Sequence, residues 1–267
     1  MFTLIRTAAL AAAFGAAAAA TATPFDVRYE SEAAGLQNTT ATFTVGGVER
    51  FETPSLGTGE AFATDFGTAG KINGVYSNVQ INSVDQYGGA GGTGQYAVSF
   101  ERNGSYSLDL ATTIRGGVNY FGFWLSALDA GNQVAFFSKG RKLFTFSPSD
   151  VIAAVNSHPN PAAYYGNPNA AFAGQDRGEP FIFLNFFSKD RPFDKVVFSE
   201  KNSGGGYESD NHTVGHFLTE GTGTGVPLSP ASFRGAVPEP ATWLMMVAGF
   251  ALVGATVRRR RMTVVAA

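Results

Sequence analysis

Apolar and polar residues alternate over short stretches of this chain, and turn-forming residues separate those stretches. Residues 95–101 are Gln-Tyr-Ala-Val-Ser-Phe-Glu and residues 106–110 are Tyr-Ser-Leu-Asp-Leu, with apolar side chains at alternate positions. A period of two is typical of β-strands that bury one face. The Asn103-Gly104 pair between them favours a hairpin turn. We therefore predict that these two strands pair with each other.

Similar segments predict a chain made almost entirely of strands. Val118–Leu125 is apolar at nearly every position, which indicates a strand buried on both faces. A short helix is predicted only at 150–155, and residues 157–178, rich in Pro, Asn, Ala and Gly, are expected to form a long surface loop. The other predicted strands are 25–30, 41–51 (with a turn at Gly46-Gly47), 72–81, 133–138 and 142–147 (joined at Lys139-Gly140-Arg141), 181–187, 195–199 and 214–218. About ten to twelve short strands predict an all-β fold, an antiparallel β-sandwich of jelly-roll type.

The N-terminus has the features of a secretory signal peptide. Arg6 supplies a positive charge, and residues 8–20 are apolar and mostly alanine. Ala20-Thr21-Ala22 fits the small-residue rule for signal-peptide cleavage. We therefore predict that residues 1–22 are removed by cleavage after Ala22.

The C-terminal residues combine a Pro-Glu-Pro motif, an apolar segment and an arginine cluster. Residues 241–257 carry no charge, and as a helix they would extend about 25 Å, slightly less than a hydrocarbon core of about 30 Å. Pro240 suits the first turn of a helix, and Trp243 suits the membrane interface. The arginines that follow keep this end in the cytoplasm by the positive-inside rule. The pattern predicts a single transmembrane helix, either a transient inner-membrane anchor or an ordinary tail anchor.

This order of features resembles the PEP-CTERM sorting signal. The matching residues are Pro238, Glu239, Pro240, Ala241, Trp243, Arg258, Arg259, Arg260 and Arg261. In that family exosortase, a membrane-embedded cysteine protease, cleaves near the signal and releases the protein to the cell surface or the exopolysaccharide matrix. The resemblance implies a Gram-negative host that makes exopolysaccharide, with the Sec machinery and exosortase as export partners. One small departure is that residues 262–267 follow the arginines.

These features divide the chain into a signal peptide (1–22), a β-sandwich (23–220), a flexible linker (221–236) and a sorting signal (237–262). Without the two targeting segments, 14 basic and 20 acidic residues remain, a net charge of −6. That charge disfavours nucleic-acid binding. The chain has no cysteine, which excludes disulfides and a cysteine nucleophile.

The Phe-rich part of the body shows a second resemblance. Residues 120–124 are Tyr-Phe-Gly-Phe-Trp, residues 128–132 are Leu-Asp-Ala-Gly-Asn, and residues 207–211 are Tyr-Glu-Ser-Asp-Asn. Over residues 117–214 this arrangement resembles a family of exosortase-dependent surface proteins, apart from the Pro/Asn/Ala-rich insertion. The resemblance implies a β-sandwich body and does not imply an activity.

Two polar groups are candidates for metal binding. Asp129 and Asn132 follow the central predicted strand, where their side chains can cap backbone groups in a turn. Their side-chain oxygens are also of the kind that bind Ca²⁺, although no Asp-rich loop with the spacing of a calcium site surrounds them. Glu208 and Asp210 are the other candidates. In a strand, their even spacing places them on one face with His212, near His216. A solvated or turn-capping role is the alternative, and no cofactor is expected.

Three aromatic residues are candidate glycan contacts. Trp124 lies in the central predicted strand, so its ring is expected either to be buried in the core or to stack on a sugar. Tyr164 and Tyr165 lie in the long predicted loop, where we expect them to face solvent.

Signals for catalysis are weak. No G-x-S-x-G motif occurs. Glycoside hydrolysis needs two carboxylates at a set separation, but among so many acidic residues some pair will have that separation by chance, so this criterion does not indicate a hydrolase. We therefore expect an exported, exosortase-processed, non-enzymatic protein with a structural or adhesive role in the exopolysaccharide layer. The alternative is a carbohydrate-binding module or a glycan hydrolase.

Overall fold

The described part of the chain is almost entirely β-structure. The computed structural model describes residues 25–30, 38–100, 104–128, 130–201, 205–229 and 248–250. Its strands are β1 (Phe25–Glu30), β2 (Thr42–Glu49), β3 (Gly57–Thr64), β4 (Ile72–Ser83), β5 (Gln95–Phe100), β6 (Tyr106–Thr112), β7 (Tyr120–Ser126), β8 (Gln133–Ser138), β9 (Arg141–Thr145), β10 (Ile182–Ser188), β11 (Lys195–Ser199), β12 (Gly206–Thr219) and β13 (Thr224–Gly225). The helices are α1 (Pro148–Asn156) and the 3-10 turns η1 (Ala90–Gly92), η3 (Pro161–Tyr164) and η4 (Ala170–Phe172). The predicted all-β class is confirmed.

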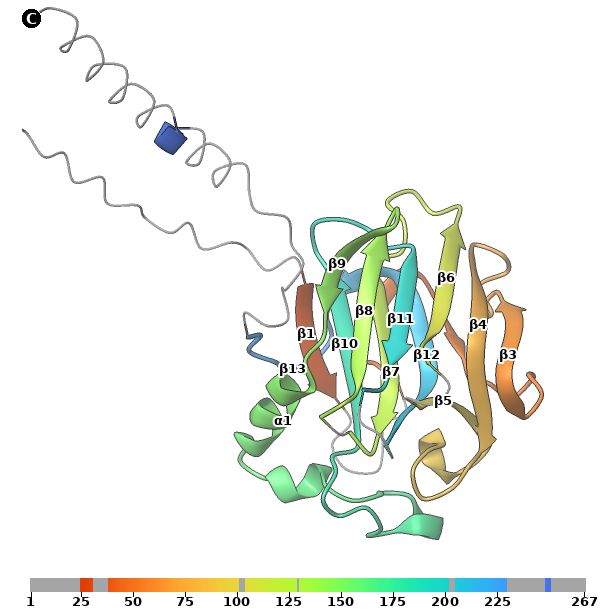
Figure 1. Ribbon diagram of the computed structural model, residues 1–267, viewed down its shortest axis with the longest axis vertical. Coiled ribbons are helices and arrows are strands. Elements are labelled where there is room, and N and C mark those ends of the chain that lie inside the picture. The colour runs from red at the N-terminus through yellow and green to blue at the C-terminus, as the bar shows by residue number, and fades with distance from the viewer. Residues whose placement is uncertain are drawn as a thin grey trace, which may run out of the picture.

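The strands form one continuous 13-stranded sheet that curls on itself. Its order is β13-β1-β10-β7-β12-β5-β4-β6-β11-β8-β9, with β2 paired to β12 and β3 paired to β4. The pairings between these strands are all antiparallel. In Figure 1, β8, β9, β11 and β6 lie in front of β10, β7 and β12. The predicted layered antiparallel fold is therefore present as a single curled sheet instead of two separate jelly-roll sheets.

Strand β4 carries the chain from one layer to the other. Its first half, Ile72–Ser77, pairs with β6, and its second half, Gln80–Ser83, pairs with β5. Asn78 lies between the two halves with φ 61, a left-handed conformation that asparagine tolerates better than most residues. The break at Asn78 lets the two halves belong to different parts of the curled sheet.

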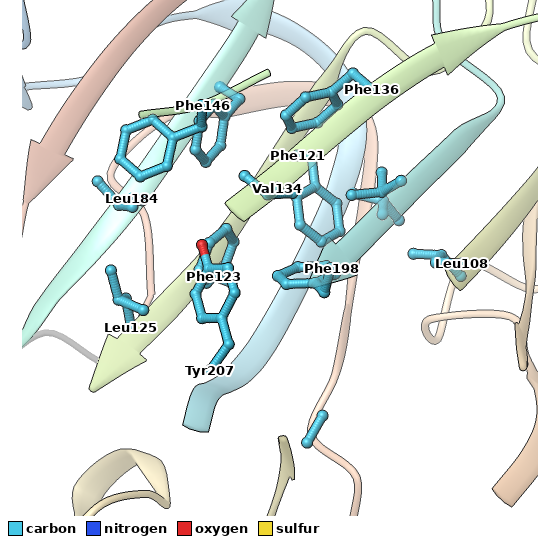
Figure 2. Packing of buried hydrophobic residues seen from close by; sticks show 14 of the residues in the cluster. Leu108, Phe121, Phe123, Leu125, Val134, Phe136, Phe146, Leu184, Phe198 and Tyr207 are labelled. Carbon is cyan, nitrogen blue, oxygen red and sulfur yellow. The ribbon is translucent and has the colours of Figure 1, made fainter. Parts of the chain in front are cut away.

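Aromatic rings from both layers meet in the core. Phe121 and Phe123 of β7 contact Phe136 of β8 and Phe198 of β11 at ring-centroid distances of 6.1 Å and 5.2 Å. Figure 2 shows Phe121, Phe123, Phe136 and Phe198 converging in this space. All seven residues of β7 are buried, and β7 pairs with β10 and β12. The predicted central strand is confirmed: β7 is covered on both faces, which matches its nearly continuous apolar sequence.

Two predicted hairpins are wrong, while a third is confirmed. β5 and β6 do not pair with each other, because both pair in succession with the same edge of β4. Residues 46 and 47 lie within the unbroken strand β2 and not in a turn. A Cβ at Gly47 would lie 2.1 Å from the Phe66 carbonyl oxygen, so glycine serves close backbone approach here. The β8–β9 hairpin forms as expected, with positive φ at Lys139 and Gly140.

The folded body extends into the predicted linker. β13 pairs with β1, and the Val226 amide donates to the Val27 carbonyl at 2.8 Å. The Ser229 amide donates to Asp150 Oδ2 at 3.0 Å, which ties the chain to α1. Residues 224–229 of the segment predicted as a linker at 221–236 therefore pack against the folded body. Figure 1 shows β13 beside β1, near α1.

The predicted targeting segments are almost wholly outside the described residues. Residues 1–22 are not described, and of the predicted membrane span only 248–250 are. Within the part of the chain that the structure describes, no helix has the length and apolar character to cross a membrane.

Candidate functional site

A polar cleft lies where the end of β4, the start of β5 and the start of β12 come together. Its volume is about 360 Å³. We call it the tyrosine cleft; its lining residues are Asn82, Asp85, Tyr87, Tyr96, Phe100, Ala127, Glu179, Gly205, Gly206 and Glu208. This size lies within the roughly 300–1,000 Å³ range of small-molecule sites.

A chain of side-chain hydrogen bonds runs along the cleft. Gln80 Nε2 donates to Asn82 Oδ1 at 2.9 Å, and Asn82 Nδ2 donates to the Tyr96 hydroxyl at 3.3 Å. That hydroxyl donates to Asp85 Oδ2 at 2.9 Å. Burial, together with the charge of Asp85, raises the pKa of Tyr96 well above its ordinary value, so the phenol stays protonated. Each polar group is thereby held in one orientation before any ligand arrives.

Asp85 also shapes the loop that carries Tyr87. Its Oδ1 accepts from the backbone amides of Tyr87 at 2.8 Å and Gly88 at 3.1 Å, which is an Asx-type turn. A Cβ at Gly88 would lie 2.4 Å from the Tyr96 ring, so only glycine lets the loop pass this close. The turn leaves the Tyr87 side chain 44% exposed beside the cleft.

The long insertion supplies another part of the cleft. Asn167 Nδ2 donates to the Gln86 carbonyl at 2.8 Å, which joins the insertion to the Tyr87 loop. Glu179, near the end of the insertion, lines the cleft. The segment predicted as a surface loop at 157–178 therefore packs through Asn167 against the loop that follows β4.

A second hollow continues from the tyrosine cleft along β4. Its volume is about 420 Å³, and it shares Asn82 and Asp85 with the cleft. We call it the outer groove; its lining residues are Leu56, Gly57, Thr58, Gln80, Ile81, Asn82, Ser83 and Asp85. Thr58 and Ser83 add hydroxyl groups, and Leu56 is an exposed apolar side chain at one end.

Asp210 binds the glycine-rich loop, residues 88–94, through a backbone amide. Its Oδ2 accepts from the Ala90 amide at 2.8 Å, and its Oδ1 accepts from the Asn211 amide at 2.6 Å. Burial, with a smaller contribution from Glu52, raises the pKa of Asp210 to about 7 despite the two amide donors. Asp210 is therefore a structural acceptor beneath residues 88–94.

A β-bulge separates Asp210 from His212. The β12–β7 register shifts between Asp210 and Thr213, and Asn211 has φ 49. One extra residue turns the following side chains to the opposite face of the strand. The expectation that Glu208, Asp210 and His212 share one face is therefore wrong: Glu208 lines the cleft, while His212 lies in the core.

His212 lies in an aromatic cage within the core. Its Nδ1 is 2.9 Å from the Tyr76 hydroxyl, and its Nε2 is 3.0 Å from Ser209 Oγ, which in turn is 2.9 Å from the Tyr106 hydroxyl. The Phe198 ring stacks on the imidazole at 5.1 Å. Burial lowers the pKa of His212 to about 3, so the ring is neutral. Because both side chains are fully buried, the Ser209–His212 contact has a structural role in the core.

The predicted aromatic candidates lie outside the cleft. Trp124 is 3% exposed in a cluster with Phe181, which confirms the core position. Tyr164 is 2% exposed and packs edge-on against Tyr29, so the expectation that it faces solvent is wrong. Tyr165 is half-buried, and its hydroxyl donates to Asn156 Oδ1 at 2.8 Å.

The structure describes Asn132, Glu208 and Asp210 of the predicted metal candidates. Asn132 is fully buried and donates to Glu200 Oε2 at 2.6 Å and to the Gly206 carbonyl at 2.8 Å, which is a structural role. Asp129 lies outside the described residues. Across 25–30, 38–100, 104–128, 130–201, 205–229 and 248–250, no three His, Cys, Asp or Glu residues are placed to hold a metal ion. His216 Nδ1 contacts the Gly117 carbonyl at 2.9 Å, on a different part of the sheet.

Of the residues that line the tyrosine cleft, sequence reasoning singled out Glu208, and only as a metal candidate. Asp85 and Tyr87 lie in a polar connection, and Tyr96 was assigned only to the buried face of a strand. The available signal was Asp85-Gln86-Tyr87-Gly88, an Asx-turn sequence that presents an aromatic residue. Recognising the cleft also requires Glu179 and Glu208, which tertiary folding brings to the same place.

Comparison with known proteins identifies the C-terminal segment. The family model for the PEP-CTERM protein-sorting motif matches residues 236–261. No curated protein and no solved structure matches the chain. The matched range contains the Pro-Glu-Pro motif, the apolar segment and the four arginines. The chain therefore carries a PEP-CTERM sorting motif, which supports an exosortase-targeted, exported cell-surface protein.

Proposed function

We propose that the β-sheet body is a non-enzymatic adhesive module of the exopolysaccharide layer and that it contacts glycan through the tyrosine cleft. The observation that carries this proposal is the preorganised hydrogen-bond chain from Gln80 to Asp85, with Tyr87 exposed beside it. The sorting motif supplies the address at the cell surface.

The side chains of the cleft match the chemistry of a sugar. Sugar hydroxyls need both donors and acceptors, which amides, carboxylates and phenols provide together. A tyrosine such as Tyr87 offers an apolar ring face and a polar tip, which suits the apolar C–H face and the hydroxyl rim of a pyranose. Groups held by internal hydrogen bonds lose little further freedom on binding, so more of the contact energy appears as affinity.

Two features support a binding role over a catalytic one. Both oxygens of Asp85 accept hydrogen bonds from the protein, as expected for a residue that shapes a turn. The Ser209–His212 pair, which has the composition of a nucleophile and its base, is sealed in the core. A hydrolase acting through the cleft carboxylates Glu179 and Glu208 is the second candidate, because they line the same cleft.

The test is binding of purified full-length chain to exopolysaccharide from an exosortase-bearing host. We expect Tyr87→Ala to lower binding about tenfold, since it removes the exposed ring, which corresponds to about 1.4 kcal/mol. Tyr165→Phe is the matched control, because this half-buried tyrosine lies outside the cleft lining, and it should bind as the parent does.

Unchanged binding by Tyr87→Ala would overturn the role of the cleft. Release of new reducing ends during incubation, abolished by Glu208→Gln, would instead establish the hydrolase.

A further inference from the structure

Strand β3 lies at the rim of the curled sheet with one edge unpaired. It pairs with β4, and no other strand of the described chain pairs with it. Figure 1 shows β3 as the outermost strand, beside β4. The backbone amide and carbonyl groups along its second edge can therefore pair with another extended chain.

The other sheet edges within the described residues are protected, and β3 is not. β13, at one end of the strand order, has only two residues, and β9, at the other end, carries the exposed residues Arg141 and Lys142. The second edge of β2 meets the loop after β3, where the Val48 amide donates to the Phe66 carbonyl at 2.9 Å. Short strands, basic side chains and covering loops all limit pairing between sheet edges. β3 has eight residues and contains no Lys, Arg or Pro.

The sequence of β3 suits pairing with a second copy of itself. Exposed and partly buried positions alternate regularly over residues 60–64. An antiparallel pair centred on Phe62 places this ring opposite the same ring of the second copy. The exposed Ala61 then lies opposite Ala63. Glu60 lies opposite the uncharged Thr64, so no like charges face each other across the seam.

This pairing would remove apolar surface from water on both faces of the sheet. On one face, the partly buried Phe62 stacks on Tyr76 at a ring-centroid distance of 4.8 Å, and a second Phe62 ring would extend this aromatic cluster. On the other face, Val75, which pairs with Ala63, is 49% exposed. Aromatic and aliphatic side chains that meet across two strands stabilise the strand pair.

We propose that the chain forms a two-fold symmetric dimer in which β3 pairs antiparallel with β3 of a second copy. Two-fold symmetry uses the same surface of both copies and leaves no free β3 edge. The dimer goes beyond the proposed adhesive function, because residues 60–64 line neither the tyrosine cleft nor the outer groove. Glycan binding and dimer formation can therefore succeed or fail independently.

Sedimentation velocity of the purified full-length chain over a concentration series measures the dimer dissociation constant. Ala61→Lys/Ala63→Lys places like charges opposite each other at two positions of the seam and should raise this constant at least about tenfold. Ala61→Lys/Ala63→Glu places opposite charges there and should return the constant to within about threefold of the parent value. This recovery would also exclude misfolding as the cause of the first effect.

Ala111→Lys/Thr113→Lys is the matched control for added charge. Both residues are exposed, and Ala111 lies on β6, which pairs with β4 on one side and β11 on the other. This variant should dimerise as the parent does. The predicted apolar segment at 241–257 is the same in every variant, so differences between variants report on β3.

Disulfide trapping tests the register of the seam, because the chain itself has no cysteine. An oxidised equimolar mixture of the Ala61→Cys and Ala63→Cys chains should give a covalent dimer, since these positions lie directly opposite each other. Either variant alone should give little covalent dimer. Its two cysteines would lie on a diagonal of roughly 7–8 Å, beyond the reach of a disulfide.

Three results would overturn the dimer. The first is a chain that stays monomeric up to about 1 mM, which would leave the β3 edge for a different partner or for none. The second is a dimer that Ala61→Lys/Ala63→Lys does not weaken, which would place the interface elsewhere. The third is covalent dimer formed equally well by each cysteine variant alone, which would exclude the register centred on Phe62. Glycan binding by a monomeric chain would leave the adhesive function standing.

Discussion

Asp210 and His212 occupy opposite kinds of environment although they are two residues apart. Asp210 lies beneath the glycine-rich loop with its pKa raised to about 7, and His212 lies in the aromatic cage with its pKa lowered to about 3. Even spacing in the sequence predicts one shared face. The bulge at Asn211 decides otherwise, because the register with β7 shifts between Asp210 and Thr213 and turns the following side chains to the other face.

These two residues should affect stability against pH with opposite signs. The folded state keeps Asp210 protonated from pH 3.8 to about 7 while the unfolded chain has released the proton, so stability falls as pH rises through that window. The folded state keeps His212 neutral from pH 6.5 down to about 3 while the unfolded chain binds a proton, so stability falls as pH drops. Each slope is about 1.4 kcal/mol per pH unit, and the two cancel where the windows overlap.

Urea unfolding of two variants between pH 4 and 8 separates the contributions. Relative to the parent, Asp210→Asn should gain free energy of unfolding as pH rises from 4 to 7. His212→Gln should gain relative free energy as pH falls below 6.5. Parallel pH profiles for parent and variants would show that neither group titrates differently in the folded state.

At the scale of elements, the last described strand was missed because it is short and glycine-rich. β13 contains only Thr224 and Gly225, within a Gly/Thr/Pro/Ser stretch that is typical of linkers. Its pairing with β1 and the burial of Val226 follow from long-range contacts that leave no local pattern. The missed β3 has a similar cause, because its glycines and exposed residues give little alternation.

Val226→Ala should destabilise the body by about 2 kcal/mol, since it removes buried methyl groups from a core of fixed shape. Val75→Ala is the matched control: Val75 is 49% exposed, and its truncation should change the free energy of unfolding by less than about 0.5 kcal/mol. Denaturant midpoints measure both. Equal effects of the two substitutions would mean that residues 224–229 do not belong to the folded body.

At the scale of the whole molecule, the chain combines a folded body with predicted targeting segments at both ends. The motif match at 236–261 supports exosortase targeting, and Ser229 marks the last described residue of the body before it. The cleft and the sorting motif are thus on separate parts of the chain. Loss of the C-terminal segment need not alter the cleft.

Mass spectrometry of the protein released by an exosortase-bearing host should show both ends removed. We expect an N-terminus at Thr23 and a C-terminus that excludes Arg258 to Arg261, with β13 retained. A host lacking exosortase is the control and should keep the C-terminal residues. A released protein that still contains the arginine cluster would contradict exosortase processing.

The sequence by itself determined the features whose causes are local. The Pro-Glu-Pro motif, apolar segment and arginines are contiguous, so the sorting motif is legible without a fold. Short strand-like segments between turn residues likewise predicted β1, β8 and β9, and a nearly continuous apolar run predicted the buried β7.

Only the tertiary structure decided which strands pair and where the cleft lies. β5 and β6 pair with successive parts of one long edge of β4 and not with each other, although the residues between them favour a hairpin turn. The side chains of Asp85, Tyr96, Glu179 and Glu208 are up to 123 residues apart in the sequence and meet only when the sheet curls. Such convergence depends on packing between distant segments, which a one-dimensional pattern does not encode.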